Sequence, residues 1–235
     1  MAGSRQPDLI WCSGSSRRYT EIAVAAGFRY GARLPDTVYP EIAPLYFADQ
    51  DWRRPAREAY LAAVRRWRPA LATALDWERE EQLPEVLAWA EDLAALVQVV
   101  IVIPKVFGGI ARLPHAVGGR PVRLGYSAAT SYGGTGVPMW DFVAWPHGVH
   151  VLGGSPQRQL RLARYLDVRS VDGNVARRMA NAHCAYWVPG SATGCANRWW
   201  PHLQGTGAGG WGHDAPYEAF RRSCTNILAA WEGGR

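Results

Sequence analysis

Three aspartates stand where apolar runs of the sequence give way to polar residues. Asp49 ends the run PLYFAD, Asp76 lies within LATALDWE, and Asp172 lies within VRSVDGN. A carboxylate at such a position can attack an anomeric carbon, stabilise a cationic oxocarbenium-like centre, or accept hydrogen bonds from the edge of a purine. It can equally cap the next helix or turn a loop. The chemistry therefore depends on whether the fold brings the three side chains together.

The elements that would position these side chains alternate along the chain. Eight apolar runs of strand length occur, at residues 8–14, 28–34, 44–49, 71–78, 97–105, 121–127, 148–154 and 168–174. Several are nearly continuous in Val, Ile, Leu and Ala, which is typical of parallel strands buried on both faces. Most are followed by a segment whose apolar residues recur every three or four positions, as in a helix with one buried face. Those segments are RRYTEIAVAAG, RRPAREAYLAAVRRWRP, QLPEVLAWAEDLAAL, SPQRQLRLARYLD and VARRMANAHC.

This alternation predicts an α/β fold, a compact (β/α)8 TIM barrel with a C-terminal helical tail. The barrel is expected over residues 8–180, and residues 181–235 are expected to form a loop and a helix packed on it, all within one domain. The links after the second and sixth runs are too short or irregular for full helices, and an open doubly wound sheet is the alternative. A core is available for either fold, because 48% of the 235 residues are hydrophobic and 12 are Trp.

Polar residues gather where the predicted strands end. In a barrel these ends meet on the face that carries active sites. Besides the three aspartates they include Cys12, Lys105, Tyr126, Ser127, Gly153, Gly154, Ser155 and Asn174. The starts of the strands offer mostly Pro, Val, Leu and Ala, so charge is expected on one rim only. The asymmetry predicts that Asp49, Asp76 and Asp172 converge in the mouth of the barrel.

The net charge of +6 is carried by arginine, because Lys105 is the only lysine in the chain. The planar guanidinium of Arg binds two phosphate oxygens at once, which favours nucleic acid or another polyanion as a partner. A genome rich in G and C, which encodes Arg in place of Lys, explains the excess equally well.

Compartment and metal content can also be read from the sequence. No run reaches the roughly 18 apolar residues of a membrane span, and MAGSRQPDLIW lacks the apolar region of a signal peptide, so we expect a cytoplasmic protein. Four cysteines in a chain of this length do not make a disulfide framework. Histidines and cysteines gather near the C-terminus, at His183, Cys184, Cys195, His202, His213 and Cys224. The gaps after Cys184 are 10, 6 and 10 residues, unlike the close pairs of zinc sites. No metal or cofactor is predicted, with zinc as the less favoured alternative.

One long stretch, VHVLGGSPQRQLRLARYLDVRSVDGN (149–174), resembles the last two βα units of the tRNA-guanine transglycosylase superfamily. In that family a strand ends in a Gly-x-Gly-Thr-Pro type turn, and the next strand carries Asp-x-Phe-Asp, whose second Asp is the covalent nucleophile. The resemblance places Gly153 and Gly154 in the turn, where they would contact substrate, and makes Asp172 the nucleophile.

Two further stretches agree with this resemblance, which covers most of residues 8–180 in order through short motifs. PLYFAD is similar to the family's Pro-Ile-Leu-Thr-Asp segment, which implies that Asp49 is a general base and pocket residue. ALDWE is similar to the strand ending in Phe-Asp-Glu, whose Asp hydrogen-bonds the guanine-like base, and this implies the same role for Asp76.

The sequence also departs from the family pattern. Tyr-Ala-Val-Gly-Gly-Leu is reduced to RLGYS, which leaves Gly125 and Tyr126, and the expected Val-Gln-Gly-Gly is VIPKV, so Lys105 stands where a base-reading Gln would be. The Cys-x-Cys-x2-Cys zinc cluster of the tRNA-acting members is absent. What remains resembles the phage and bacterial branch that inserts 7-deazaguanines into DNA. A phage-encoded member would act in the host cytoplasm.

The implied activity is that of a glycosyltransferase that exchanges guanine in DNA for a 7-deazaguanine such as 7-cyano-7-deazaguanine. Asp172 would bond to C1′, Asp49 would manage the proton on the leaving or entering base, and Asp76 would read N1–H and the 2-amino group. The pocket would also be lined by Lys105, Gly125, Tyr126, Gly153 and Gly154. Because the nucleotide must leave the base stack, stacking and phosphate contacts are expected from Trp52, Arg53, Arg54 and Trp77. The implied partners are DNA, less so tRNA, the deazaguanine base, and a second copy of the chain in a homodimer.

Several alternatives stay open at this point. Within the same fold they are a tRNA-guanine transglycosylase and an N-glycosidase that hydrolyses instead of exchanging. From other classes they are a non-catalytic nucleic-acid-binding subunit and a Schiff-base aldolase that uses Lys105.

Overall fold

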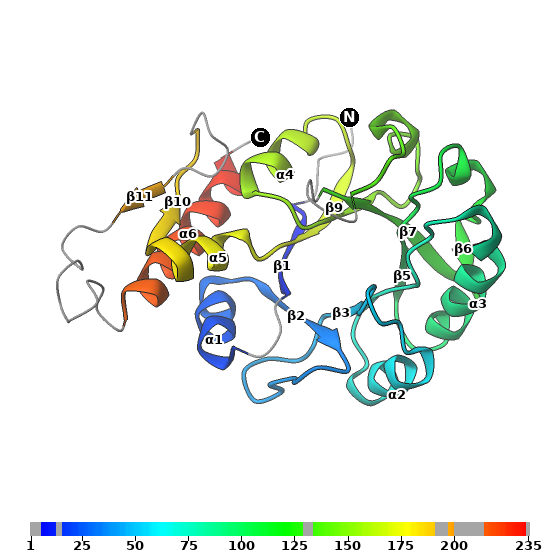
Figure 1. Cartoon of the computed structure of the whole chain (residues 1–235), viewed down its shortest axis with the longest axis horizontal. Coiled ribbons are helices and arrows are strands. Elements are labelled where there is room, and N and C mark those ends of the chain that lie inside the picture. Colours follow the sequence, from blue (N-terminus) through cyan, green and yellow to red (C-terminus); the bar gives the residue numbers. More distant parts are fainter. Residues whose placement is uncertain (1–5, 13–15, 129–133, 191–196, 200–213, 234–235) are drawn as a thin grey trace.

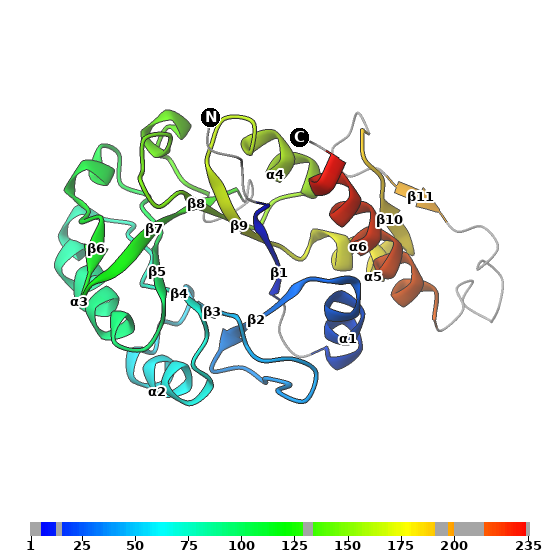
Figure 2. The same cartoon turned by 180° about the vertical axis from the view of Figure 1, so that it is seen from behind.

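A computed structural model of the protein describes residues 6–12, 16–128, 134–190, 197–199 and 214–233. Parallel strands form a closed barrel, in which each strand pairs with the next and the last returns to the first. In order around the barrel they are β1 (Asp8–Cys12), β2 (Arg29–Leu34), β3 (Phe47–Gln50), β4 (Leu71–Thr73), β5 (Val99–Val102), β7 (Arg120–Ser127), β8 (Val149–Leu152) and β9 (Val168–Asp172). The short β6 (Ala116–Val117) pairs antiparallel with β7. Figures 1 and 2 show the barrel strands around the centre of the molecule and the helices outside them.

Each of the eight predicted runs overlaps one of these strands, so the predicted TIM barrel is confirmed. The parallel pairing of β5 with β7 closes the sheet and excludes the open doubly wound alternative. Several strands are shorter than the apolar runs that contain them. β4 ends at Thr73, and Asp76 therefore lies in the segment beyond the strand, where Trp77 forms an isolated bridge with Pro104.

Helices occur where the three- and four-residue spacing predicted them. They are α1 (Arg17–Ala26), α2 (Arg57–Trp67), α3 (Leu83–Ala94), α4 (Pro156–Leu162), α5 (Val175–His183) and α6 (Ala215–Gly233). Short 3-10 turns form η1 (Glu80–Gln82), η2 (Gly109–Arg112) and η3 (Met139–Phe142). As expected, residues 35–46 contain no helix, and the described part of the β7–β8 link contains only η3.

The barrel interior is a packed core of its own. Ile10, Cys12, Phe47, Leu71, Ile101 and Ile103 form one buried cluster inside the strands, separate from the larger core between strands and helices. Because side chains fill the interior, the barrel is a packed core with a site at one end and is not a pore. Gly125 of β7 faces this interior, where an added Cβ would lie 2.6 Å from Ile103 Cγ1 and 2.8 Å from Leu152 Cδ1.

The close approach at Gly125 gives a stability prediction. Because the neighbouring side chains come from adjacent strands and have little room to move, Gly125→Ala should lower the free energy of unfolding by about 1–3 kcal/mol, the usual cost of overpacking a core. Urea unfolding followed by tryptophan fluorescence measures this. Gly233→Ala is the matched control, since an added Cβ there meets nothing within 4 Å. Equal stability of the two variants would contradict the packing argument.

The C-terminal helix α6 packs on the outside of the barrel against α1 and α5 (Figure 1). Phe220 of α6 contacts Trp11 of β1 and Tyr19 of α1, with ring centroids 4.7 and 5.0 Å apart. Cys224 is buried in the same helix. The hairpin of β10 (Ala185–Trp187) and β11 (Asn197–Trp199) was not predicted, because three-residue strands carry too little periodicity to recognise.

Candidate active site

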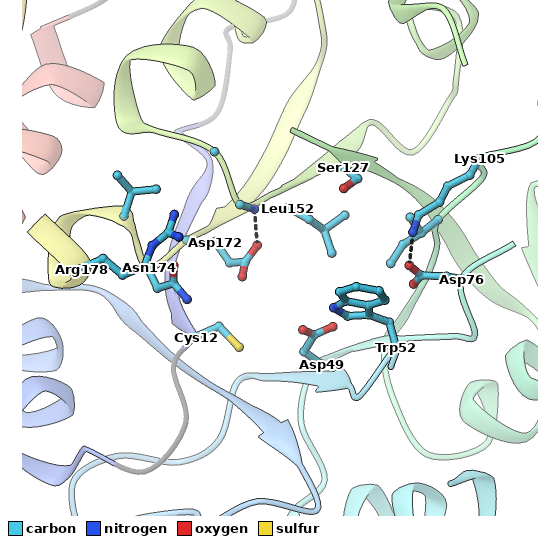
Figure 3. A pocket seen from close by; sticks show the side chains of 15 residues that line it. Cys12, Asp49, Trp52, Asp76, Lys105, Ser127, Leu152, Asp172, Asn174 and Arg178 are labelled. Carbon is cyan, nitrogen blue, oxygen red and sulfur yellow. Dashed lines mark hydrogen bonds and ion pairs between the residues drawn. The ribbon is translucent and has the colours of Figure 1, made fainter. Parts of the chain in front are cut away.

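A cavity of about 200 Å³ opens where the barrel strands end (Figure 3). Its walls contain all three aspartates singled out in the sequence, Asp49, Asp76 and Asp172, and so the predicted convergence is confirmed. The other lining residues are Cys12, Trp52, Ile103, Lys105, Ser127, Leu152, Gly153, Gly154, Gly173, Asn174, Val175 and Arg178. The three carboxylates differ in their surroundings, which gives each a different chemical character.

Asp172 is the last residue of β9, and the neighbouring turn after β8 holds its carboxylate. The backbone N–H of Gly153 donates to Asp172 Oδ1 over 3.1 Å. Gly153 and Gly154 have φ of 65° and 76°, values that favour glycine, so the LGGS sequence allows the turn that aims this N–H. The amide of Gln159 in α4 fixes the two segments, because its Nε2 donates to the backbone oxygens of Gly153 and Asp172 at 2.9 and 2.6 Å.

Asp49 lies near the end of β3, and its carboxyl group is partly buried in the cavity wall. Thr73 Oγ1 accepts the N–H of Gln50 at 2.9 Å and lies 3.1 Å from Asp49 Oδ1, so its hydroxyl proton donates to the carboxylate. Burial raises the pKa of Asp49 well above the ordinary carboxyl range, and the negative charges of Asp172 and Asp76 raise it further. Asp49 is therefore suited to hold a proton that a carboxylate in water would lose.

Asp76 forms a buried ion pair with Lys105. Lys105 Nζ lies 2.7 Å from Asp76 Oδ2 and 2.9 Å from Glu78 Oε1, and the Gln50 amide donates to Asp76 Oδ1 over 3.3 Å. Burial raises the pKa of Asp76 although Lys105 opposes the shift. For Lys105 burial acts to lower the pKa, but the charge of Asp76 and its hydrogen bonds to both carboxylates outweigh it and leave the pKa raised. The pair presents a cation and a paired acceptor to one side of the cavity.

Trp52 supplies a flat wall between Asp49 and the Asp76–Lys105 pair (Figure 3). Trp52 is 38% exposed, and Lys105 Nζ lies 5.6 Å from the centroid of its ring. Arg53 and Arg54 follow in the same loop and are exposed. Arg178, on the first turns of α5, also lines the cavity and was not predicted. Nothing in the sequence distinguished Arg178 from the other residues of its helix or from its neighbour Arg177.

The sulfur at the end of β1 belongs to the cavity wall without being a nucleophile. Burial raises the pKa of Cys12 well above the ordinary thiol value, and the charges of Asp49 and Asp172 add to the effect. Because the thiolate is the reactive form, these surroundings leave Cys12 as a neutral packing residue.

Three residues expected at the site are elsewhere, and those predictions are wrong. Trp77 is 0% exposed, with its Nε1–H donating to the Arg79 carbonyl over 2.8 Å, so it offers no face to nucleic acid. Tyr126 points to the outer face of β7, where its ring packs edge-on against Phe142 with centroids 5.1 Å apart. Gly125 serves interior packing and does not line the cavity. In each case strand alternation or the turn beyond the strand, and not the residue type, decided the placement.

The floor beneath the cavity holds polar residues that sequence reasoning missed. His150 of β8 and Ser170 of β9 are both 0% exposed, with His150 Nδ1 at 2.8 Å from Ser170 Oγ. The sequence did contain a signal for them. Each is a polar residue in a predicted apolar strand, and each stands two residues before the strand end, at a position that faces the barrel interior. The expectation of uncharged strand starts is also wrong, because Asp8 and Arg123 lie at the other end of the barrel, where Tyr46 donates to Asp8 Oδ2 over 2.6 Å.

Neither a metal-binding cluster nor a membrane-spanning helix occurs in the part of the chain that the structure describes. No group of three or more His, Cys, Asp or Glu there could hold a metal ion. Cys195, His202 and His213 of the C-terminal set lie outside the described residues. Among the described helices none combines the length and apolar character needed to cross a membrane.

Fold and site together define a βα-barrel protein with three carboxylates in one cavity, on the face where barrel enzymes bind their substrates. The chain belongs to a family of unknown function designated DUF6610, whose model matches residues 20–232. No curated protein and no solved structure gives a significant match to the chain.

Proposed function

We propose that the protein is a guanine transglycosylase that replaces guanine in DNA by a 7-deazaguanine, through a covalent bond between Asp172 and the deoxyribose. The observation that carries the proposal is the convergence of Asp49, Asp76 and Asp172 on a single cavity. A cavity of about 200 Å³ is smaller than the sites of drug-sized ligands, and its scale suits one nucleobase with part of its sugar.

In the first half of the reaction a carboxylate oxygen of Asp172 attacks C1′. The C1′–N9 bond breaks, its electron pair goes to N9, and the departing guanine takes a proton from Asp49. The raised pKa of Asp49 supports this role, because the acid must still carry its proton near neutral pH. The hydrogen bond from Gly153 keeps the attacking carboxylate in place.

In the second half the entering deazaguanine occupies the same pocket. Its N9–H proton goes to Asp49, N9 attacks C1′, and the bond between C1′ and the Asp172 oxygen breaks, with the electron pair returning to the carboxylate. Asp49 and Asp172 end in the states in which they began, so no further reactant is needed. Exchange occurs in place of hydrolysis when water is excluded from the site while the bond between Asp172 and C1′ exists.

Base recognition falls to the wall formed by Asp76, Lys105 and Trp52. A carboxylate is a paired acceptor for the N1–H and 2-amino groups of guanine, and Lys105 supplies the opposite charge that favours the ionised form of Asp76 against the effect of burial. Trp52 offers a face for base stacking, which offsets the cost of taking the nucleotide out of the duplex. The ion pairing that raises the pKa of Lys105 argues against a neutral amine, and hence against a Schiff-base aldolase.

DNA is the proposed polymer, held by arginines around the cavity. Arg178 lines the opening, and Arg53 and Arg54 follow Trp52. Together with the net charge of +6 they favour a phosphate backbone as partner. A tRNA substrate would use the same contacts and is the second form of the proposal.

The deciding experiment is incubation of the purified protein with DNA and labelled guanine, followed by digestion and nucleoside analysis. We expect label in deoxyguanosine, and its replacement by the deazaguanine nucleoside when 7-cyano-7-deazaguanine is added. Free guanine with abasic sites would instead identify an N-glycosidase. DNA binding without release or incorporation would identify a non-catalytic subunit, and the same assay on tRNA separates the two polymers.

A further inference from the structure

A chain of polar side chains runs through the barrel interior and ends at Asp172. Arg123 Nη1 donates to Ser170 Oγ over 2.9 Å, and Ser170 Oγ lies 2.8 Å from His150 Nδ1. His150 Nε2 in turn lies 3.5 Å from Asp172 Oδ1. These residues come from β7, β8 and β9, and both Ser170 and His150 are 0% exposed. The base-exchange scheme makes no use of His150.

The hydrogen-bonding partners determine which ring nitrogen of His150 carries the proton. Arg123 can only donate, so the Ser170 oxygen accepts from it. If the Ser170 hydroxyl then donates to Nδ1, both contacts of Ser170 are hydrogen bonds and the ring proton sits on Nε2. The other tautomer would leave a lone pair of Nε2 facing the Asp172 carboxylate, which is repulsive.

The Nε2 position is buried and has no hydrogen bond within 3.5 Å that meets normal geometry among the described residues. A polar group kept dry in a barrel core is costly unless it is paired. Asp172 Oδ1 lies 3.5 Å from Nε2, and contacts of this length commonly shorten when substrate binds. Packing of the ring against Phe47, with centroids 4.9 Å apart, fixes the direction in which Nε2 points.

Two donors thus approach the same oxygen of Asp172. The Gly153 N–H reaches Oδ1 at 3.1 Å, and His150 Nε2 reaches Oδ1 at 3.5 Å. Figure 3 shows the Gly153 bond to one carboxylate oxygen, with the other oxygen turned away from it. We propose that His150, as the Nε2–H tautomer, is a positioning residue that holds Oδ1 and thereby selects Oδ2 as the atom that attacks C1′. The role of Oδ2 in the attack rests on the proposed function. The assignment of the Nε2–H tautomer rests on geometry alone.

The tautomer is tested without any activity measurement. Long-range 1H–15N spectra of protein labelled at histidine show which ring nitrogen is protonated, and the His150 signals are identified by their loss in His150→Gln. We expect the Nε2–H form in the wild type, and a rise of the Nδ1–H form in Ser170→Ala, which removes the hydroxyl donor. A wild-type ring protonated on Nδ1 alone would overturn the proposal.

The positioning role is tested by the rate of adduct formation between the protein and a guanine-containing oligonucleotide. His150→Leu should slow this step by roughly 10- to 100-fold, by analogy with the loss of partners that orient metal ligands, with little change in KM. His150→Gln keeps a donor near the Nε2 position and should recover part of the rate. His115→Leu, a histidine that packs on Trp145 outside the barrel interior, should match the wild type.

The outcomes separate this inference from the proposed function. Wild-type rates in a folded His150→Leu protein would overturn the positioning role. If the wild type itself forms no adduct while the Nε2–H tautomer is observed, the transglycosylase proposal fails, and the hydrogen-bonded placement of Asp172 stands for whatever reaction the site performs.

Discussion

Replacement of Asp172 by asparagine is expected to abolish base exchange, with a loss of at least about 10³-fold, as for other enzymes that lose a covalent nucleophile. An amide oxygen still accepts the Gly153 N–H, so the turn after β8 and the fold should persist. Incorporation of labelled guanine measures the loss, and a denaturing gel measures the adduct directly. The wild type should retain labelled DNA on the protein band, and the variant should not.

Two further variants complete the test of Asp172→Asn. Asp167→Asn changes the same residue type at the opposite end of β9, where Asp167 pairs with Arg169 in solvent, and should leave exchange intact. Gly173 follows position 172, and Asn-Gly sequences deamidate to aspartate. Asp172→Ala therefore serves as a second variant that cannot revert. Unchanged turnover in both would remove Asp172 from the chemistry.

The strands and the acidic site could be predicted because they depend on patterns that tertiary contacts reinforce. The strand β5 is continuous in Val and Ile, as is typical of strands covered on both faces. Parallel strands in a closed barrel end on one face, so a polar residue at the end of any strand is brought to the same place. This is why Asp49 and Asp172, 123 positions apart in the sequence, could be assigned to one cavity.

The errors have a common physical origin in side-chain direction. Tyr126 and Ser127 are neighbours at the end of β7, yet only Ser127 lines the cavity, because successive side chains of a strand point to opposite faces. Trp77 lies beyond the end of β4, where no alternation applies, and its burial depends on η2 folding over it. Strand register is set by pairing across the barrel, which composition and motif spacing do not encode.

His150 was missed for a different reason. A lone histidine inside an apolar strand is usually a buried residue satisfied by a nearby carbonyl, and nothing in VHVLGG distinguishes the two cases. Its role becomes visible only when β9 places Ser170 on one side of the ring and Asp172 on the other. Polar chains that cross several strands are properties of the assembled barrel.

Asp49→Asn is expected to lower base exchange by roughly 10²- to 10⁴-fold, the usual contribution of a general acid–base residue, and at the same time to stabilise the protein at neutral and higher pH. The two effects share one cause. Burial and the charges of Asp172 and Asp76 raise the pKa of Asp49 in the folded state above its value in the unfolded chain. The folded protein therefore holds the proton more tightly than the unfolded chain does.

The sign of the pH dependence follows from linkage. The favourable contribution of protonated Asp49 is complete below the unfolded carboxyl pKa of about 4 and is lost as the pH rises through the higher folded value. A neutral asparagine loses nothing over this range, and it still accepts the Thr73 hydroxyl. The stability gain of Asp49→Asn over the wild type should thus be smallest near pH 4 and should grow toward pH 8 in urea unfolding. Asp51→Asn, two residues further on and outside the cavity wall, should show neither the gain nor the loss of exchange. A gain that does not depend on pH would mean that Asp49 is ionised throughout, and the proton would then have to come from another group in the site.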